Sequence, residues 1–148
     1  MGIIRGGDSE YEEHEPSFEE KTAEWQKTLQ PLLEEEPGTL KLSGRYISSD
    51  DVKIICNYPG IKTVRVLDLA DNQVNDEALP VLFESENLVQ LEELYLGINF
   101  LIGEGLTKIA CSSQIKLGNL KKLVISDNRL TDASVADFIR SKNFPSLE

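Results

Sequence analysis

A nine-residue pattern of leucines recurs along the chain at nearly constant spacing. Its clearest copy is LEELYLGIN at residues 91–99, and related copies occupy residues 64–72 and 120–128. A fourth and more divergent copy begins at residue 37. Self-similarity at a fixed period is typical of chains that stack small, similar units, each of which buries its apolar side against its neighbours. This repeat constrains the fold more than the composition does.

The similarity between the copies extends well beyond the nine residues. Aligned on their second apolar residue, the copies place Leu40, Leu67, Leu94 and Leu123 at one position. Five residues later they hold Arg45, Asn72, Asn99 and Asn128. Apolar residues also recur two, seven, twelve, fifteen and twenty-one residues after the aligned leucine. The third copy is two residues longer than the others; we place the extra residues around 116–118, and expect Ile115 to fill its last apolar position.

The pattern resembles the leucine-rich repeat family, and within it the ribonuclease-inhibitor-like class with repeats of 27–29 residues. The resemblance implies an α/β, right-handed solenoid with parallel strands on its concave face and helices on its convex face. The repeats are expected at residues 37–63, 64–90, 91–119 and 120–146, and Leu147 reads as the start of a fifth. Pro37 and Arg45 depart from the pattern, as in an atypical end repeat. We interpret the chain as part of a longer array.

The residues within each repeat predict a strand, a turn, a helix and a return loop. Leu94 and Leu96 alternate with Tyr95, which is typical of a strand with one buried face. Polar clusters at residues 48–51, 75–77 and 131–132 can accept hydrogen bonds from the free amides of a first helical turn. The three asparagines follow the strands. We interpret them as a structural ladder that satisfies backbone groups, rather than as Ca²⁺ ligands.

The first 36 residues differ from the rest in charge. They contain eleven acidic and three basic residues of a chain whose net charge is −11, which argues against a nucleic acid or an anionic membrane as partner. Residues 1–16 are predicted to be a disordered acidic tail, and residues 17–36 an amphipathic helix that starts at a Ser17–Glu20 capping box and would kink or split at Pro31. Its apolar stripe, which includes Trp25, either caps the first repeat or docks another protein, and we favour the cap.

The sequence offers little for catalysis or for binding a metal or cofactor. The single histidine, His14, lies in the acidic tail with no nucleophile placed to work with it, and the chain has no phosphate-binding GxxxxGK[ST] motif. Cys56 and Cys111 have no metal-ligand spacing, and we expect both to be buried free thiols. We therefore predict no enzymatic activity, no cofactor and no metal. With neither a signal-peptide pattern nor an apolar run long enough to span a membrane, a cytoplasmic protein is the simplest interpretation.

The exposed face of the strands is the best candidate for a functional site, because the resemblance implies a concave surface that binds proteins. Arg65, Glu92 and Lys121 alternate in sign across this face, which favours cross-strand pairing. Tyr95, Ile98 and Phe100 form an aromatic and apolar group where the other repeats are mostly polar, and this is typical of a binding hot spot. The alternative is that Phe100 packs into its loop and Tyr95 stands alone. The predicted partner-binding residues are Arg65, Asp68, Glu93, Tyr95, Ile98, Phe100 and Lys122.

The predicted function is therefore that of a monomeric, non-enzymatic module that binds a protein partner on the concave strand face. Two alternatives stay open. The chain could be the substrate-recognition part of a larger regulatory protein or ubiquitin ligase, which a catalytic domain in a longer reading frame would decide. It could also have a structural role, as a scaffold or filament cap, through its acidic N-terminal helix.

Overall fold

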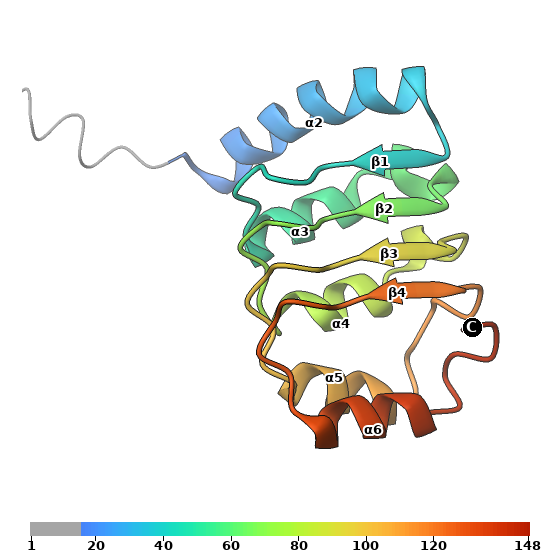
Figure 1. Ribbon diagram of the computed structural model, residues 1–148. Coiled ribbons are helices and arrows are strands. Elements are labelled where there is room, and N and C mark those ends of the chain that lie inside the picture. Colours follow the sequence, from blue (N-terminus) through green and yellow to red (C-terminus); the bar gives the residue numbers. More distant parts are fainter. Residues whose placement is uncertain (1–15) are drawn as a thin grey trace, which may run out of the picture.

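A computed structural model describes residues 16–148, so the predicted acidic tail, including His14, lies outside the described residues except for Pro16. Four short parallel strands form one sheet in sequence order (Figure 1). They are β1 (Thr39–Lys41), β2 (Val66–Asp68), β3 (Glu93–Tyr95) and β4 (Lys122–Val124). The register pairs Leu40, Leu67, Leu94 and Leu123 across neighbouring strands. The alignment made from the sequence and the α/β architecture are therefore confirmed.

A helix follows each strand, and these helices form a second layer on one side of the sheet (Figure 1). The helices are α3 (Ser49–Asn57), α4 (Ala78–Phe83), α5 (Glu104–Cys111) and α6 (Asp132–Arg140), with short 3-10 turns η1 (Pro59–Thr63) and η2 (Glu86–Leu88) in two return loops. Ser48 and Thr131 cap α3 and α6 through their side chains, as two of the polar clusters predict, whereas Glu77, the N-cap residue of α4, makes no side-chain cap hydrogen bond. Gly103, at φ 109°, turns the chain into α5, because glycine adopts this conformation without steric penalty.

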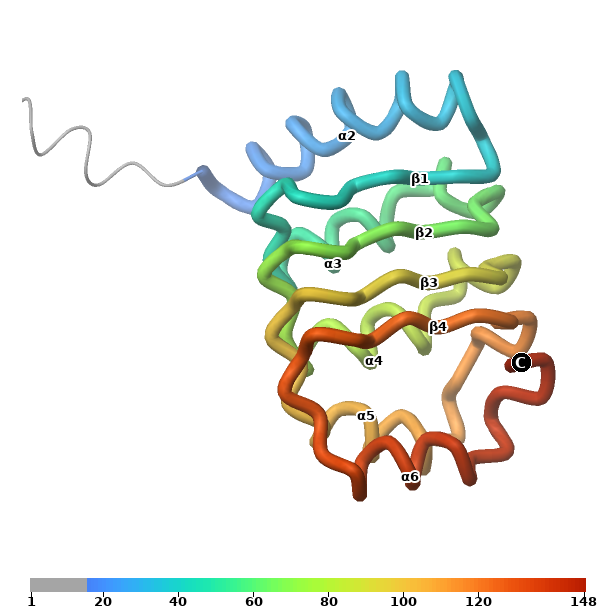
Figure 2. The backbone as a smooth tube through the Cα atoms, in the orientation of Figure 1, coloured from blue at the N-terminus to red at the C-terminus, as the bar shows by residue number. Residues whose placement is uncertain are grey.

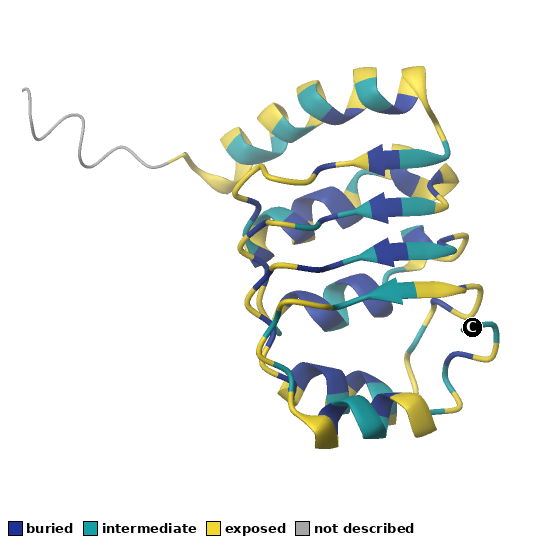
Figure 3. Ribbon diagram, viewed as in Figure 1, coloured by how far each residue is buried: buried dark blue, intermediate teal, exposed yellow. Residues whose placement is uncertain are grey.

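The core lies between the sheet and the helices and is made of the aligned apolar residues (Figure 3). Leu40, Leu67 and Leu94 are fully buried. In the fourth repeat, the matching Leu123 is only half-buried, because no further repeat of the described chain covers it. The backbone N–H of Glu148 donates to the carbonyl of Lys121, as the N–H of Lys121 does to Glu92 in the preceding repeat. Residue 148 thus lies where the earlier repeats enter their strands.

The N-terminal helix α2 (Phe18–Glu35) lies beside β1, on the side away from β2 (Figure 2). Ser17 and Glu20 form the predicted capping box. Pro31 lies within a single helix, so the predicted split is wrong; core packing on both sides of Pro31, at Leu29 and Leu33, offsets the amide hydrogen bond that proline removes. Leu29 and Leu33 are buried in the core, and Trp25 Nε1 donates to Asp51 Oδ1 of α3 at 3.1 Å. Apart from Phe18, which is 59% exposed, the apolar stripe of α2 is therefore already packed against the first repeat.

One core position was wrongly assigned from the sequence. Leu117 is fully buried, whereas Ile115 is only half-buried. The reason is a backbone turn before each strand, in which an amide donates to the carbonyl three residues earlier: Leu91 to Leu88, and Leu120 to Leu117. The two extra residues of the third repeat therefore precede Leu117, and the turn itself keeps its length.

The two cysteines differ in environment, which corrects the expectation that both are buried. Cys56 is buried and Cys111 is exposed, and both are free thiols. Cys56 directly follows the core residue Ile55, whereas Cys111 comes two residues after the core residue Ile109, about 200° around the helix from it. Burial raises the pKa of Cys56 from its ordinary value of 9.0 to about 12.

This difference predicts selective thiol chemistry. Iodoacetamide at pH 8 should modify Cys111 and leave Cys56 unmodified in the folded protein, because the thiolate is the nucleophile and a raised pKa keeps Cys56 protonated. Intact-mass spectrometry should show one adduct under native conditions and two in denaturant. A Cys111→Ser chain should take none while folded. Two native adducts formed at similar rates would show that the first repeat opens readily.

Candidate protein-interaction surface

The loops that leave the strands are held in place by a ladder of asparagine side chains. Asn99 Oδ1 accepts from the backbone N–H of Val74 at 3.0 Å, and its Nδ2 donates to the carbonyls of Leu69, Leu96 and Gly97 at 3.0, 3.1 and 3.2 Å. Asn72 and Asn128 make the corresponding bonds one repeat earlier and later. The predicted structural ladder is confirmed. The ladder ties each loop to the loop of the preceding repeat, and so fixes the positions from which the exposed side chains of these loops project.

The chain takes a left-handed turn at the same position of every repeat, four residues after the aligned leucine. The residues there are Gly44, Asp71, Ile98 and Asp127, with φ between 56° and 67°. Glycine and aspartate tolerate this conformation, but a β-branched side chain is an outlier in it. Tyr46, at φ 57°, is the other bulky residue of the described chain with positive φ. Two strained residues therefore lie in these loops.

The same loops expose four large apolar side chains, which we call the exit patch: Tyr46, Ile98, Phe100 and Ile102. Their exposed fractions are 79%, 53%, 58% and 53%. Within residues 16–148 they are four of the seven large apolar side chains that are exposed. The alternative that Phe100 packs into its loop is therefore wrong, because more than half of its surface faces solvent.

Phe100 separates two hollows in this surface. One, of about 240 Å³, is lined by Gly44, Tyr46, Asp71, Asn72, Gln73 and Phe100. The other, of about 330 Å³, is lined by Asn75, Asp76, Glu77, Phe100 and Ile102. The backbone N–H of Phe100 donates to the carbonyl of Val74 at 2.8 Å, which ties the backbone at Phe100 to the second repeat. Each hollow joins an aromatic wall to a carboxylate, a combination suited to an apolar side chain with a polar or cationic neighbour.

Of the remaining predicted residues, Glu93, Tyr95 and Lys122 lie on strands β3 and β4 and already contact one another. Tyr95 Oη donates to Glu93 Oε1 at 2.6 Å, and Lys122 Nζ lies 5.3 Å from the Tyr95 ring centroid. Asp68 accepts from the N–H of Ala70. At the predicted alternating column, Lys121 pairs with Glu92 at 3.6 Å, while Arg65 is exposed. Tyr95 is thus half-buried in a polar cluster of its own face and does not stand alone.

Two members of the exit patch, Tyr46 and Ile102, were missed from the sequence. Tyr46 lies six residues after Leu40, as Phe100 does after Leu94. Ile102 lies eight residues after Leu94, where the other repeats hold Ser48, Asn75 and Thr131. Comparing loop positions across repeats, rather than the strands alone, would have found both. The patch therefore spans the first and third repeats and crosses Gln73 of the second.

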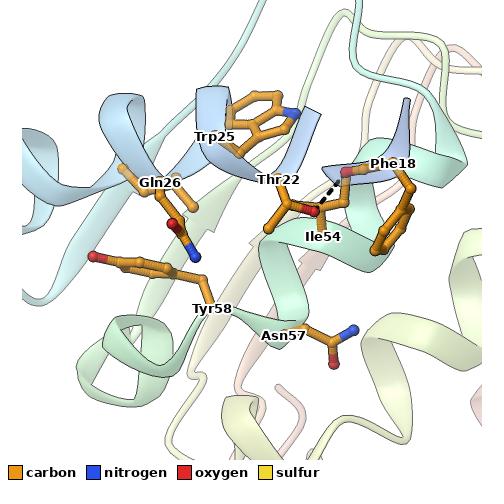
Figure 4. Close-up of a pocket in the computed structure, with 8 residues that line it drawn as sticks. Phe18, Thr22, Trp25, Gln26, Ile54, Asn57 and Tyr58 are labelled. Carbon is orange, nitrogen blue, oxygen red and sulfur yellow. Dashed lines mark hydrogen bonds between the residues drawn. The ribbon is translucent and has the colours of Figure 1, made fainter. Parts of the chain in front are cut away.

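A smaller hollow lies between α2 and α3 (Figure 4). It has a volume of about 90 Å³ and is lined by Phe18, Thr22, Trp25, Gln26, Leu29, Ile54, Asn57 and Tyr58. Ligand pockets usually measure about 300–1,000 Å³, so this space suits a few waters rather than a ligand. We interpret it as an imperfect seal where α2 meets the first repeat.

Two further properties of the described residues bear on function. Across residues 16–148, no group of three or more histidine, cysteine or acidic side chains is arranged to hold a metal ion. No helix in this part of the chain is both long enough and apolar enough to cross a membrane.

Comparison with known proteins agrees with the repeat architecture. A family profile described as "Leucine Rich repeat" matches residues 61–80 and 118–138. A search of curated proteins found no match to the chain. Among solved structures, the chain is similar to an internalin (inlF) from Listeria monocytogenes str. 4b F2365, with 22% sequence identity and a TM-score of 0.41. That alignment covers 75% of this chain and 34% of the internalin chain, so this chain spans about a third of its length.

Proposed function

The chain is a leucine-rich repeat protein, and from this premise we propose that it is a non-enzymatic module that binds a protein partner through the exit patch and the adjoining concave face. Leucine-rich repeat domains generally mediate interactions between proteins. Solenoids present extended surfaces to their partners because each repeat contributes one element to a continuous face. The proposal assigns contact roles to Ile98, Phe100 and Tyr95, with Tyr46 and Ile102 added.

The observation that carries the proposal is the strain at Ile98. An L-residue in the left-handed region lowers the stability of the fold by about 1–2 kcal/mol, and isoleucine is among the residues least suited to this conformation. Burial could offset that loss, but Ile98 is 53% exposed. The equivalent positions hold Gly44, Asp71 and Asp127, which tolerate the turn. An exposed apolar side chain kept at a strained position is best explained by contact with a partner.

The polar residues of the concave face support the same surface. Arg65, Asp68, Glu93 and Lys122 lie on strands β2 to β4 or just before them, and Glu93 and Lys122 are direct cross-strand partners. Partially exposed charges around an apolar centre resemble the polar rim of protein interfaces. We assign them a role in orienting the partner, because rim charges affect association rate and specificity more than affinity.

The packing of α2 bears on the alternative of a docking helix. Its stripe is occupied by the first repeat, with Leu29 and Leu33 in the core and Trp25 bonded to Asp51. We propose that α2 acts as the N-terminal cap of the solenoid, which an open repeat end requires. A partner that bound through this stripe would have to displace α2.

The test compares an Ile98→Asn, Phe100→Ser chain with the intact chain in affinity capture from cell extract, followed by binding measurements with the purified partner. Ile139→Ser is the matched control, because Ile139 is 73% exposed on α6. We expect the partner to bind the intact and control chains and to lose at least about tenfold in affinity for the double variant, as removal of a hot-spot residue does. Equal binding to all three chains would contradict the proposed site.

The strain argument has its own readout. Ile98→Asn alone should raise the free energy of unfolding by about 1 kcal/mol, because asparagine tolerates the left-handed conformation. Urea denaturation followed by circular dichroism measures this change. A variant that is less stable than the intact chain would show that Ile98 is retained for folding and would remove the observation on which the proposal depends.

A further inference from the structure

The distribution of charge around the exit patch is uneven. The loops that leave the strands, taken with the first turn of the helix that follows, contain eight acidic residues and two basic ones (residues 42–52, 69–81, 96–107 and 125–135). At the opposite edge, the loops that enter the strands and the helix turns before them contain eight acidic and seven basic residues (residues 32–38, 54–65, 80–92, 108–121 and 137–148). The negative charge of the repeats is therefore concentrated on the edge that carries the exit patch.

Some of these acids have a structural purpose. Asp50 and Asp51 lie in the first turn of α3, where the helix dipole favours negative charge. Asp76 accepts backbone N–H bonds from Ile102 at 2.8 Å and Gly105 at 2.7 Å. Asp71 differs, because it lies at the left-handed turn and not in a helix. Glu77 is the N-cap residue of α4 but makes no side-chain cap hydrogen bond, and both Asp71 and Glu77 are exposed, so helix capping alone does not account for this charge.

The carboxylates lie inside the same hollows as the apolar side chains. Asp71 lines the hollow between Tyr46 and Phe100, and Asp76 and Glu77 line the one between Phe100 and Ile102. Neither hollow is lined by lysine or arginine. The two basic residues of this edge are Arg129, in the fourth repeat, and Arg45, which is exposed between Gly44 and Tyr46 but does not line their hollow. Any occupant therefore meets an apolar wall with negative charge beside it.

We propose that the exit patch binds a basic linear segment of its protein partner, in which an aliphatic or aromatic anchor is flanked by lysine or arginine. The anchor contacts Phe100, and the flanking cations face Asp71 and Glu77. The inference rests on the proposed function and adds the chemistry of the partner. Arginine fits best, because its planar guanidinium can both pair with a carboxylate and stack on an aromatic ring.

The test is a peptide-display selection against the intact chain, with counter-selection on the Phe100→Ser variant. Enriched peptides should carry lysine or arginine within about three residues of a leucine, isoleucine, phenylalanine or tryptophan. Fluorescence anisotropy with the synthesised peptides should show affinity that falls as NaCl rises from about 50 to 500 mM, because salt screens exposed ion pairs. The Asp71→Asn, Glu77→Gln double variant should weaken binding roughly fivefold or more and flatten the salt dependence.

The control is Glu86→Gln, because Glu86 is an exposed acid at the opposite edge, and its loss should leave peptide affinity unchanged. Enriched peptides without an excess of basic residues would overturn the inference while leaving the proposed function intact, and so would affinity that does not depend on Asp71 and Glu77. Failure of any peptide to enrich would likewise overturn it, by showing that a linear segment is not recognised. The proposed function fails separately, if the captured partner binds the Ile98→Asn, Phe100→Ser chain as well as the intact one.

Discussion

Replacing Leu94 by alanine is expected to lower the free energy of unfolding by about 2–5 kcal/mol, the usual range for opening a cavity at a fully buried leucine. Leu94 has no exposed surface and pairs with Leu67 and Leu123 across the sheet. The cavity would therefore open between three repeats. Urea denaturation monitored by circular dichroism measures this loss as a lower denaturation midpoint, with the same slope of unfolding free energy against urea concentration in both chains.

Leu123→Ala is the matched control, because Leu123 occupies the same position of the fourth repeat but is half-buried. Its replacement should lower the free energy of unfolding by clearly less than Leu94→Ala. Equal losses would show that the fourth repeat is packed as tightly as the third. No change in the denaturation midpoint for Leu94→Ala would contradict the stacked core itself.

Asn99→Ala is expected to lower the free energy of unfolding by about 3 kcal/mol or more. The variant removes the partner of one buried amide and of three carbonyls, and a buried polar group left without a partner loses about 1–3 kcal/mol. Asn99 contacts the loops but is not one of the predicted partner-binding residues. The affinity for the captured partner should therefore change less than the stability does. Thermal or urea unfolding and binding are measured on the same samples.

Asn128→Ala provides the comparison, because Asn128 makes the same set of bonds but is half-buried. Water can reach the groups it leaves, so the loss should be smaller. An Asn99→Ala chain that unfolds like the intact one but no longer binds its partner would reverse the assignment, and would make Asn99 a contact residue.

The period of the leucines was enough to predict the sheet order, the strand register and the asparagine ladder. Each repeat needs a buried leucine in its strand and a side chain that bonds the loop after it, so the same residue types recur at those positions. A separate signal, the Ser17–Glu20 capping box, predicted a helix at residues 17–36, and α2 spans Phe18–Glu35. The leucine period failed at Ile115, because the two extra residues of the third repeat were placed around 116–118, whereas they precede Leu117 and the turn from Leu117 to Leu120 keeps its length. It also failed at Cys111, because a shift of two residues along a helix moves a side chain from the core to solvent. The right-handed sense and the ribonuclease-inhibitor-like class stay predictions.

The candidate site was only partly predictable. Ile98 and Phe100 stood out as apolar residues at positions where the other repeats are mostly polar, but their strain and their exposure depend on φ angles and packing that the alignment does not contain. Tyr46 was overlooked because its repeat is the divergent one. Tyr95 was grouped with Ile98 and Phe100, or left to stand alone, whereas Glu93 and Lys122 contact it. Whether these residues bind a partner stays a prediction.

The asparagine ladder also gives the assembly of this protein a direction. Each asparagine accepts the backbone amide of the loop before it, so the loop that ends at Ile47 is closed by a side chain 25 residues further along. A repeat leaving the ribosome is therefore incomplete until the next one has been synthesised, and the amide of Ile47 must wait in water or in a provisional contact until then. A coil can therefore complete these hydrogen bonds only when the next coil is present, whereas α2, which precedes the first coil, is already available to pack against it.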